Sequence, residues 1–469
     1  MTISKANSHS ITDWKNTIKN KKIAVVGIGV SNIPLIRLLT ENGAKVWAYD
    51  KRDAQQMGAV YEEMTALGVT MVLGEDYLDH LEGDFVYIFK TPGLRADVPQ
   101  LKAAAQSGAV ITSEMELFFE LCPVPIIAVT GSDGKTTTTT LIAEMLKRQG
   151  FTCYLGGNIG RPLLADVEKI KQGDKVVLEL SSFQLQTMKK SPHVAVVTNI
   201  TPNHLDWHTD LAEYEQAKEN IFRFQQEGDR AVFNFDNEVT RRLAQNAKGA
   251  VLFSRQSDLP DGYCLKDGQI VLCESGKIKE IILRTEDIKI PGQHNVENYM
   301  AAITAISDCV SQEIIVQTAK EFGGVPHRIE LVRELNGVKY YNDSIASSPA
   351  RTTAGLNSFK QKVILIAGGY DKKIPFDEFG IVVNEHVKEL VLVGVTSPKI
   401  EYAVKQAENY DGLSIHCCAE FEQAVNTARS LAQSGDVVIL SPACASFDLF
   451  KNFEVRGNTF KEIVNGWSE

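Results

Sequence analysis

The feature that most constrains the fold is a set of short apolar runs that alternate with longer amphipathic stretches along the whole chain. The runs are rich in β-branched residues and include KIAVVGIG, PIIAVTG, KVVLELSS, VAVVTNI and KVILIAGG. Such runs suit strands that are buried on both faces, and the stretches between them suit helices that cover a parallel sheet. The pattern therefore predicts an α/β protein.

Length and charge limit the number of domains and the kinds of partner. The chain has 469 residues, of which 44% are hydrophobic and 23% are charged, so it can form about two to four domains. Its net charge of -10 argues against a whole-surface affinity for nucleic acid or anionic membranes. We therefore expect no nucleic-acid partner, and any polyanion must be bound in a local pocket.

Cysteine usage and the N-terminal segment bear on the compartment. The 8 cysteines contain no C-x-x-C pair, which favours a reducing, cytoplasmic environment. The polar N-terminus lacks the apolar segment of a signal peptide, and no apolar run approaches the length of a membrane span. We expect neither secretion nor membrane insertion.

Turn-rich sites divide the sequence into three expected domains. Residues 1–122 begin with a Rossmann-like pattern, and two prolines in the segment LCPVP mark their end. Residues 123–324 begin with a strand that enters a glycine-rich loop, as in P-loop ATPases, and residues 250–290 within them predict antiparallel strands. Residues 325–469 form a second Rossmann-like α/β unit.

The sharpest local motif is VTGSDGKTTTTTL at residues 129–141, where an apolar strand runs into a loop and then a helix. Backbone N–H groups in such a loop cradle phosphates, a lysine bridges the β and γ oxygens, and a hydroxyl ligates Mg²⁺. The strict Walker pattern fails at its first glycine, where Val129 stands, and an ordinary strand-to-helix turn is the alternative. The residues assigned to ATP are Gly131, Ser132, Asp133, Gly134, Lys135, Thr136 and Thr137.

Two further polar residues follow the ends of later strands. Glu179 closes KVVLELSS, and His204 follows VAVVTNITPNH. Ligands gather at the carboxyl ends of parallel strands, so both residues are candidates to bind a metal or a water. As alternatives, Glu179 could cap a helix or pair with a cation, and His204 could be an ordinary loop histidine. Spacing alone makes Lys218 a solvated helical lysine.

The first strand ends in a G-x-G turn at Gly27 and Gly29, and the second strand ends at Asp50. This spacing is typical of the start of a dinucleotide-binding unit, in which the acid meets a ribose. Asn32 takes the place of the third glycine. The pattern therefore favours a nucleotide other than NAD as the ligand of this turn, and NAD is the less favoured ligand. A plain turn without a ligand is the structural alternative.

Several segments together resemble the Mur ligase family, over nearly the whole chain. Besides the phosphate loop they are GGNIGRPL, LELSSFQL, TNITPNHLDWH, PGQHNVENYMAA, PHRIE, NDSIASSP, GGYDKK and SPACASFDLFKNFEVRGNTF. The resemblance implies three α/β domains and an ATP-dependent ligase. Its implied reaction joins D-glutamate to UDP-N-acetylmuramoyl-L-alanine through an acyl phosphate, in peptidoglycan precursor synthesis.

The resemblance also implies roles for residues at the ATP site. Lys135 and Thr136 hold the phosphates and a Mg²⁺ ion, Glu179 is a metal ligand, and His204 binds a second Mg²⁺. Lys218 is similar to the family's carbamylated lysine, whose anionic group can approach Mg²⁺. Contacts to the adenine, the phosphates and the ribose are implied for Asn295, Asn298, Arg328 and Asp343.

Roles at the two other substrates follow from the same resemblance. The residues implied for the UDP-linked substrate are Ser31, Asp50, Lys51, Thr91, Asn158, Ser181 and His204, and those for D-glutamate are Lys372, Ser446 and Phe453. Where the family often has a lysine after N-D-S, this chain has Ile345. A bound carboxylate without a cation is costly, and Arg351 is the candidate replacement.

Other functions stay open at this stage. A related ligase could add a different amino acid or could add glutamate to a folate. An NAD-linked protein is a second alternative and a nucleotide-controlled switch is a third. The expected cofactors are ATP and two Mg²⁺ ions, and we expect the chain to act as a monomer.

Overall fold

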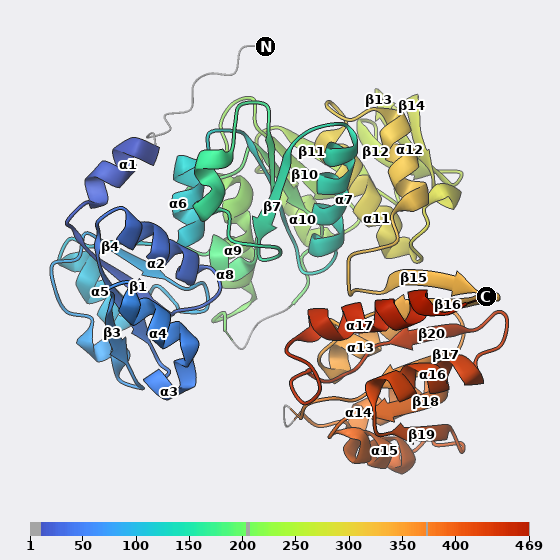
Figure 1. Cartoon of the computed structure of the whole chain (residues 1–469). Coiled ribbons are helices and arrows are strands. Elements are labelled where there is room, and N and C mark those ends of the chain that lie inside the picture. Colours follow the sequence, from blue (N-terminus) through green and yellow to red (C-terminus); the bar gives the residue numbers. More distant parts are fainter. Residues whose placement is uncertain (1–10, 203–206, 372–373, 469) are drawn as a thin grey trace. The chain divides into compact units, whose positions relative to one another are not determined.

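The computed structural model describes residues 11–202, 207–371 and 374–468. These residues form three sheets with helices around them (Figure 1). By compactness the chain divides into one unit of Met1–Thr285 with Val296–Thr318 and a second unit of Glu286–Asn295 with Ala319–Glu469. The first unit holds two of the sheets and the second unit holds the third.

The first sheet has five parallel strands in the order β3-β2-β1-β4-β5. They are β1 (Lys22–Val26), β2 (Lys45–Asp50), β3 (Thr70–Leu73), β4 (Tyr87–Lys90) and β5 (Val110–Thr112). The accompanying helices are α1 (Ile11–Ile18), α2 (Asn32–Glu41), α3 (Ala54–Met57), α4 (Ala59–Ala66), η1 (Tyr77–His80), α5 (Pro99–Gln106) and α6 (Glu114–Leu121). The strand order reverses between β1 and β4, so a ligand is expected at their carboxyl ends.

The central sheet has nine strands in the order β14-β13-β12-β11-β10-β9-β6-β8-β7. They are β6 (Ile126–Thr130), β7 (Cys153–Gly157), β8 (Lys175–Glu179), β9 (Val194–Val197), β10 (Arg230–Asn234), β11 (Ala250–Ser254), β12 (Gly262–Lys266), β13 (Gln269–Glu274) and β14 (Lys277–Arg284). The pairs from β7 to β12 are parallel, whereas β13 runs antiparallel to both of its neighbours. The expected antiparallel strands thus extend the parallel sheet.

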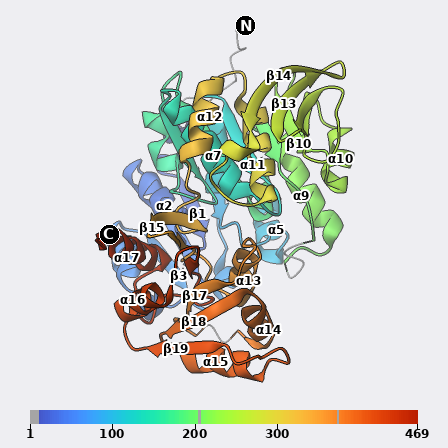
Figure 2. The ribbon, with the colours of Figure 1, turned by 90° about the vertical axis from the view of Figure 1, so that its right-hand side faces the viewer.

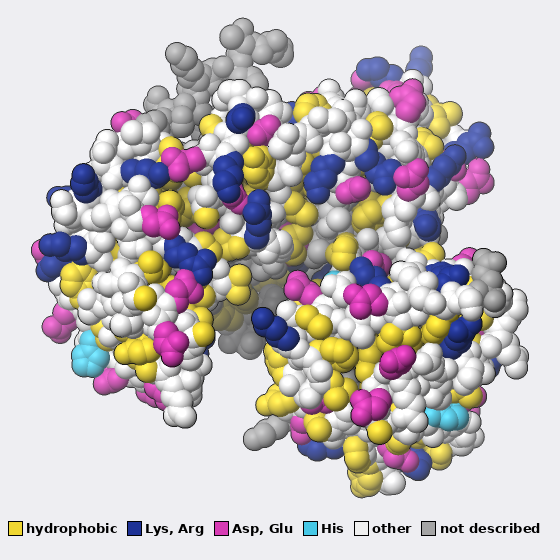
Figure 3. All heavy atoms as spheres, viewed as in Figure 1, with side chains coloured by type: hydrophobic (Ala, Val, Ile, Leu, Met, Phe, Trp, Pro, Cys, Tyr) yellow, Lys and Arg dark blue, Asp and Glu magenta, His cyan; other side chains and the backbone are white. Residues whose placement is uncertain are grey.

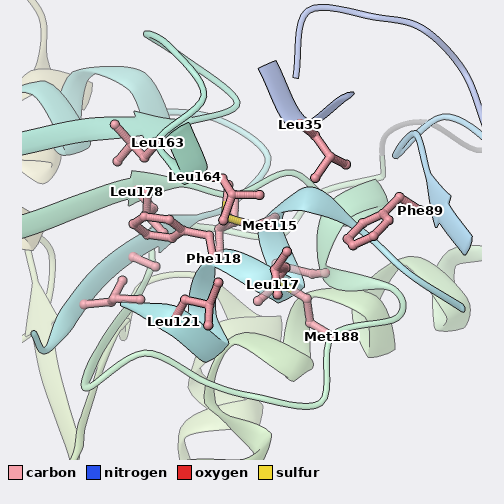
Figure 4. Close-up of a cluster of buried hydrophobic side chains, with 14 of the residues drawn as sticks. Leu35, Phe89, Met115, Leu117, Phe118, Leu121, Leu163, Leu164, Leu178 and Met188 are labelled. Atoms are coloured by element: carbon pink, nitrogen blue, oxygen red, sulfur yellow. The ribbon is translucent and has the colours of Figure 1, made fainter. Parts of the chain in front are cut away.

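Helices cover the central sheet and join it to the first one. They are α7 (Lys135–Arg148), η2 (Leu164–Lys169), α8 (Ser182–Leu185), α9 (Leu211–Arg223), α10 (Glu238–Ala244), η3 (Thr285–Asp287), α11 (Gln293–Ile306) and α12 (Gln312–Glu321). The helices α7, α11 and α12 lie together in both ribbon views (Figure 2). Met115 and Phe118 of α6 share one buried apolar cluster with Leu164 and Leu178 of the central part, which packs the two sheets together (Figure 4).

The third sheet has six strands in the order β15-β16-β20-β17-β18-β19, all parallel except for β15. They are β15 (Glu330–Leu335), β16 (Val338–Asn342), β17 (Val363–Ala367), β18 (Val387–Val393), β19 (Ser414–Cys418) and β20 (Val437–Leu440). One face packs on α13 (Pro349–Leu356), α14 (Asp377–His386) and α15 (Ser397–Gln406), and the other on α16 (Phe421–Leu431) and α17 (Phe453–Gly466). Alternate residues of β17 point to the two cores, as the period of a strand requires.

The expected α/β class with parallel sheets is therefore confirmed, whereas the boundaries at residues 122 and 324 stay a prediction. No helix in the described ranges is both long and apolar enough to cross a membrane. On the face that Figure 3 shows, positive and negative side chains of the described residues are interspersed.

Candidate functional site

The loop between β6 and α7 turns the chain sharply from strand into helix. Gly134 precedes α7 with a φ of 77°, a left-handed conformation that favours glycine. A Cβ atom at this position would lie 2.3 Å from Oδ1 of Asn298 on α11, so the close approach of that helix also requires glycine. The loop thereby leads directly into the first N–H groups of a helix of 14 residues, which is an arrangement that binds phosphate.

Other residues of the loop are held in place by the segment that follows β9. The Asp133 amide donates to Oδ1 of Asn199 at 2.9 Å, and the Thr198 hydroxyl donates to the Asp133 carbonyl at 2.6 Å. Lys135 folds back over the loop, where Nζ donates to the carbonyls of Gly131 and Ser132 at 2.8 and 2.7 Å. The lysine therefore lies over the same turn whose amides suit phosphate.

Glu179 ends β8 beside this loop and is almost completely buried. One of its carboxylate oxygens, Oε1, accepts a hydrogen bond from the side chain of Asn158 at 2.7 Å. The other, Oε2, is buried and has no hydrogen-bond partner among the described residues. Two residues later, Ser181 caps α8 by accepting from the Gln184 amide. A buried carboxylate oxygen that is open in this way suits a metal ion.

Lys218 lies on α9, and its side chain is buried rather than solvated as spacing suggested. Nζ donates to the Gly131 carbonyl at 2.8 Å and to the Thr130 hydroxyl at 3.4 Å, and it lies 4.8 Å from the centre of the Tyr214 ring. Burial lowers the pKa of Lys218 well below its usual value, and the nearby charge of Lys135 lowers it further. Burial therefore disfavours the charged form of this amine.

The polar groups that could hold a metal ion at this site lie on different strands and helices. Thr136, in the first turn of α7, is buried. Within the described ranges, no group of three or more His, Cys, Asp or Glu side chains is arranged to hold a metal ion. The open oxygen of Glu179 and the buried hydroxyl of Thr136 are the donors that fit Mg²⁺.

In the first sheet, the G-x-G turn is closely packed against the end of β4. Gly27 has a φ of 87°, and a Cβ atom there would lie 2.7 Å from Cγ2 of Thr91. Asn32, in the place of a third glycine, donates from Nδ2 to the Gly27 carbonyl at 2.7 Å and so stabilises the turn. The structure thus places Thr91 beside this turn, and Ser31 lies at the start of α2 without a side-chain capping bond.

Asp50 binds the turn directly. Its Oδ2 accepts from the Ile28 amide at 2.7 Å, and Arg52 donates to both carboxylate oxygens at 2.8 Å. Burial would raise the pKa of Asp50, but the hydrogen bonds from Arg52 and Ile28 lower it below its usual value. Lys51 points elsewhere and forms an exposed ion pair with Glu75 at 3.0 Å. Of the two neighbouring cations, Arg52 is the one at the turn.

In the second unit, Asp343 follows the end of β16 and is buried. Its carboxylate accepts from the Ser441 hydroxyl at 2.7 Å and from the Ile329 amide at 3.2 Å. Burial raises the pKa of Asp343 to about 7, although the charges of Arg328 and Arg351 oppose the rise. This aspartate therefore lies at the carboxyl edge of the third sheet, within reach of the charges of both arginines.

The position of Ile345 bears on amino-acid recognition. Arg351, on α13, donates from Nη1 to the Ile345 carbonyl at 3.4 Å, and its side chain is exposed. The structure thus brings the candidate cation next to the residue that replaces the family lysine.

Asn295 belongs to the second unit, where its side chain donates to the Pro291 carbonyl at 2.6 Å, whereas Asn298 belongs to the first.

Ser446 is buried, and Phe453 begins α17 with a half-buried side chain. The Ser344 hydroxyl donates to the Phe453 carbonyl at 2.8 Å, which joins the loop after β16 to α17. Arg456 is buried and donates to Ser344 Oγ at 3.0 Å and to the Cys444 carbonyl at 3.1 Å. This arginine holds the N-D-S loop and the loop of Ser446 together.

Two predicted residues, His204 and Lys372, lie outside the described residues. The sequence interpretation did not single out Arg52 or Arg456. The sequence feature that could have indicated Arg52 is its position two residues after Asp50. For Arg456 it is the position three residues after Phe453, in a segment that carried the resemblance.

The comparisons with protein families and with curated relatives agree. Residues 129–306 match the Mur ligase middle domain, and residues 327–444 match the Mur ligase, glutamate ligase domain. The UDP-N-acetylmuramoylalanine–D-glutamate ligase of Acetivibrio thermocellus is 58% identical over 97% of this chain and 98% of that protein. The protein of the same name from Clostridium perfringens is 51% identical over 97% of this chain and 98% of its own length.

Solved structures share the fold at lower identity. The UDP-N-acetylmuramate-alanine ligase of Thermotoga maritima is 21% identical, with a TM-score of 0.55 over 95% of this chain and 99% of that one. The MurF ligase of the same organism, in complex with ADP, is 17% identical, with a TM-score of 0.53 over 96% of both chains.

Proposed function

The chain belongs to the Mur ligase family, and on that premise we propose how its site carries out the reaction. The chain joins D-glutamate to the terminal carboxylate of UDP-N-acetylmuramoyl-L-alanine and consumes ATP, in peptidoglycan precursor synthesis. The observation that supports this chemistry best is that Lys135, Lys218 and Glu179 meet at the phosphate loop. A cationic lysine, a carboxylate that suits a metal ion and a second, buried amine at one point suit the transfer of a phosphoryl group to an acid.

Joining a carboxylate to an amine in water is unfavourable until the acid oxygen becomes a good leaving group. A carboxylate oxygen of the UDP-linked substrate attacks the γ-phosphorus of ATP, so that an acyl phosphate forms and ADP leaves. The amine of D-glutamate then attacks the acyl carbon, loses a proton and expels phosphate as the amide forms. Lys135 and the N–H groups at the start of α7 hold the phosphates and stabilise the negative charge that develops.

Two Mg²⁺ ions are part of the proposal. Thr136 and Glu179 would hold one of them, and His204 together with Lys218, if carbamylated, the other. Bound Mg²⁺ supplies positive charge that neutralises phosphate oxygens. The burial of Lys218 and its lowered pKa support the modification, because a neutral amine can add CO₂, lose a proton and become an anionic carbamate.

The UDP-linked substrate is assigned to the turn after β1 and to the residues around Glu179. Ser31, Asp50 and Thr91 surround the turn, and we add Arg52 because it holds Asp50 in place. Lys51, which is exposed, keeps its assignment as a contact to the phosphates or the uridine. Asn158 and Ser181, on either side of Glu179, lie nearer to the sugar and the lactyl group.

D-Glutamate is assigned to the loops at the carboxyl edge of the third sheet. Ser446, Phe453 and Lys372 are the proposed contacts. Arg351 supplies the cation that Ile345 does not, and its contact with the Ile345 carbonyl supports this role. We propose that the chain acts as a monomer with three domains, at residues 1–122, 123–324 and 325–469. The 8 cysteines are free thiols, which supports a location in the cytoplasm.

A coupled assay of ADP release tests the proposal. With UDP-N-acetylmuramoyl-L-alanine, D-glutamate, ATP and Mg²⁺ together, we expect ADP and one new amide, and omission of any component should stop amide formation. The alternative is a related ligase, with another amino acid or a folate acceptor. Turnover with folate and none with the UDP-linked substrate would overturn the proposal in favour of that alternative.

A further inference from the structure

A loop of the first sheet contacts the helix that carries Lys218, and both lie in the first unit. The loop follows β4 and runs from Thr91 to Asp97, whereas α9 belongs to the central sheet. Arg95 joins the two, because its Nη1 and Nη2 donate to the two carboxylate oxygens of Glu213 at 3.0 and 2.8 Å. Such a two-pronged contact fixes the orientation of both groups.

Trp207 adds two further bonds to this contact. Arg95 Nη1 donates to the Trp207 carbonyl at 3.0 Å, and Trp207 Nε1 donates to the Gly93 carbonyl at 2.9 Å. The guanidinium of Arg95 also lies 5.2 Å from the centre of the Trp207 ring and pairs with Asp97. The loop is therefore attached to the central part by both backbone and side-chain groups.

Glu213 in turn contacts the residues just before α9 and the residue that ends α8. It accepts from the Thr209 amide at 2.7 Å and from the Gln186 side chain at 3.1 Å. His208 lies 3.5 Å from Glu213, and its Nε2 is 2.9 Å from Oγ of Ser182, in the first turn of α8. The hydrogen bond from Arg95 lowers the pKa of Glu213 to about 2, so this carboxylate is charged at neutral pH.

The next residue on α9 leads to the phosphate loop. The Tyr214 hydroxyl lies 2.8 Å from Oγ of Ser132, and the Tyr214 ring lies beside Lys218 Nζ. A continuous series of contacts therefore runs from the loop of Thr91, through Arg95, Glu213 and Tyr214, to the residues assigned to ATP.

We propose that Arg95 is a positioning residue, which couples binding of the UDP-linked substrate at the first sheet to binding of nucleotide at the phosphate loop. The inference rests on the proposed function, because that function places the UDP-linked substrate at Thr91. Coupling between two sites is reciprocal, so each ligand tightens the binding of the other. Arg95 touches neither reacting group and acts through Glu213 and α9.

Calorimetric titration of Mg·ADP tests this coupling without turnover. In the unmodified protein, saturating UDP-N-acetylmuramoyl-L-alanine should raise the affinity for ADP by about fivefold or more. Arg95→Ala should reduce that factor to below about twofold, yet bind ADP alone as the unmodified protein does. Arg95→Lys should restore part of the coupling. The double variant Arg95→Ala, Glu213→Ala should lose no more of the coupling than either single variant does.

Arg37→Ala is the matched control, because Arg37 forms an exposed ion pair with Glu63 within the first sheet's helices. It should keep the full coupling. Three results would each overturn the inference. Arg95→Ala could keep normal coupling, or the unmodified protein could show none. Arg95→Ala could also lose the same amount of ADP affinity with and without UDP-N-acetylmuramoyl-L-alanine. Formation of the amide product with D-glutamate is measured in the unmodified protein as well. If the product forms, the proposed function holds, and any of these outcomes counts against the coupling alone.

Discussion

Glu179 has one carboxylate oxygen bonded to Asn158 and another that is buried without a hydrogen bond among the described residues. A buried charge without a partner is costly, so we expect Mg²⁺ at this oxygen. Glu179→Gln keeps the shape but removes the charge. It should lower kcat by about 100-fold or more and raise the Mg²⁺ concentration for half-maximal rate, as a Mg²⁺ titration of ADP release can measure.

Glu168→Gln is the control for this substitution. Glu168 forms an exposed ion pair with Lys15 at 2.8 Å, away from the phosphate loop. It should leave both kcat and the Mg²⁺ requirement unchanged. An unaltered Mg²⁺ requirement in Glu179→Gln would show that Glu179 is not a metal ligand.

Asp343 predicts a pH dependence of stability. In the folded protein the carboxyl group of Asp343 stays protonated up to about pH 7. An aspartate in the unfolded chain loses its proton near pH 4. Between these values the folded state binds more protons, so the free energy of unfolding falls as the pH rises, by on the order of 4 kcal/mol in total. This contribution is constant below about pH 4 and above about pH 7.

Asp343→Asn removes the titrating group, so the variant should gain thermal stability relative to the unmodified protein as the pH rises from 4.5 to 7.5. Thermal midpoints of both proteins across this range measure the difference. Asp411→Asn, at an exposed position, should show a constant difference. The same constant difference for Asp343→Asn would refute the raised pKa.

At the scale of elements, the turn into α7 depends on Gly134. Alanine there adds left-handed backbone strain of about 1–2 kcal/mol and a clash with Asn298. We expect Gly134→Ala to raise the KM for ATP by about tenfold or more. Gly150→Ala, also at positive φ but with open space around its Cβ position, is the matched control. Equal KM values for the two variants would contradict the role of the clash.

The phosphate loop was predictable from sequence even though it departs from the Walker pattern. Val129 is a buried residue of β6 that pairs with Glu179, so the loop begins only at Gly131. The strand, loop and helix are local features, and local periodicity is enough to reveal them. The same holds for the alternation of apolar strands and helices along the chain.

Residues whose role depends on distant packing were not predictable from spacing alone. Lys218 looked solvated, but it is buried against Thr130 and Gly131, which are 88 and 87 positions away in sequence. Arg456 likewise reaches Ser344, 112 positions earlier. For Lys218 it was the resemblance to a family, and not residue periodicity, that indicated a function.

At the scale of the whole molecule, the assigned residues are shared between the two compact units. ATP, the UDP-linked substrate and D-glutamate must meet, and water must be kept from the acyl phosphate. We therefore expect the units to move relative to each other when the ligands bind. Small-angle scattering should show a smaller radius of gyration with Mg·ADP and the UDP-linked substrate present, and identical profiles would count against closure.

The central claim is that the chain activates the substrate acid by phosphorylating it. The most direct test uses UDP-N-acetylmuramoyl-L-alanine labelled with ¹⁸O in its terminal carboxylate and mass spectrometry of the phosphate released during amide formation. An acyl phosphate transfers one labelled oxygen from each substrate molecule to phosphate. We predict that transfer, and phosphate that carries no ¹⁸O while the amide accumulates would contradict the mechanism.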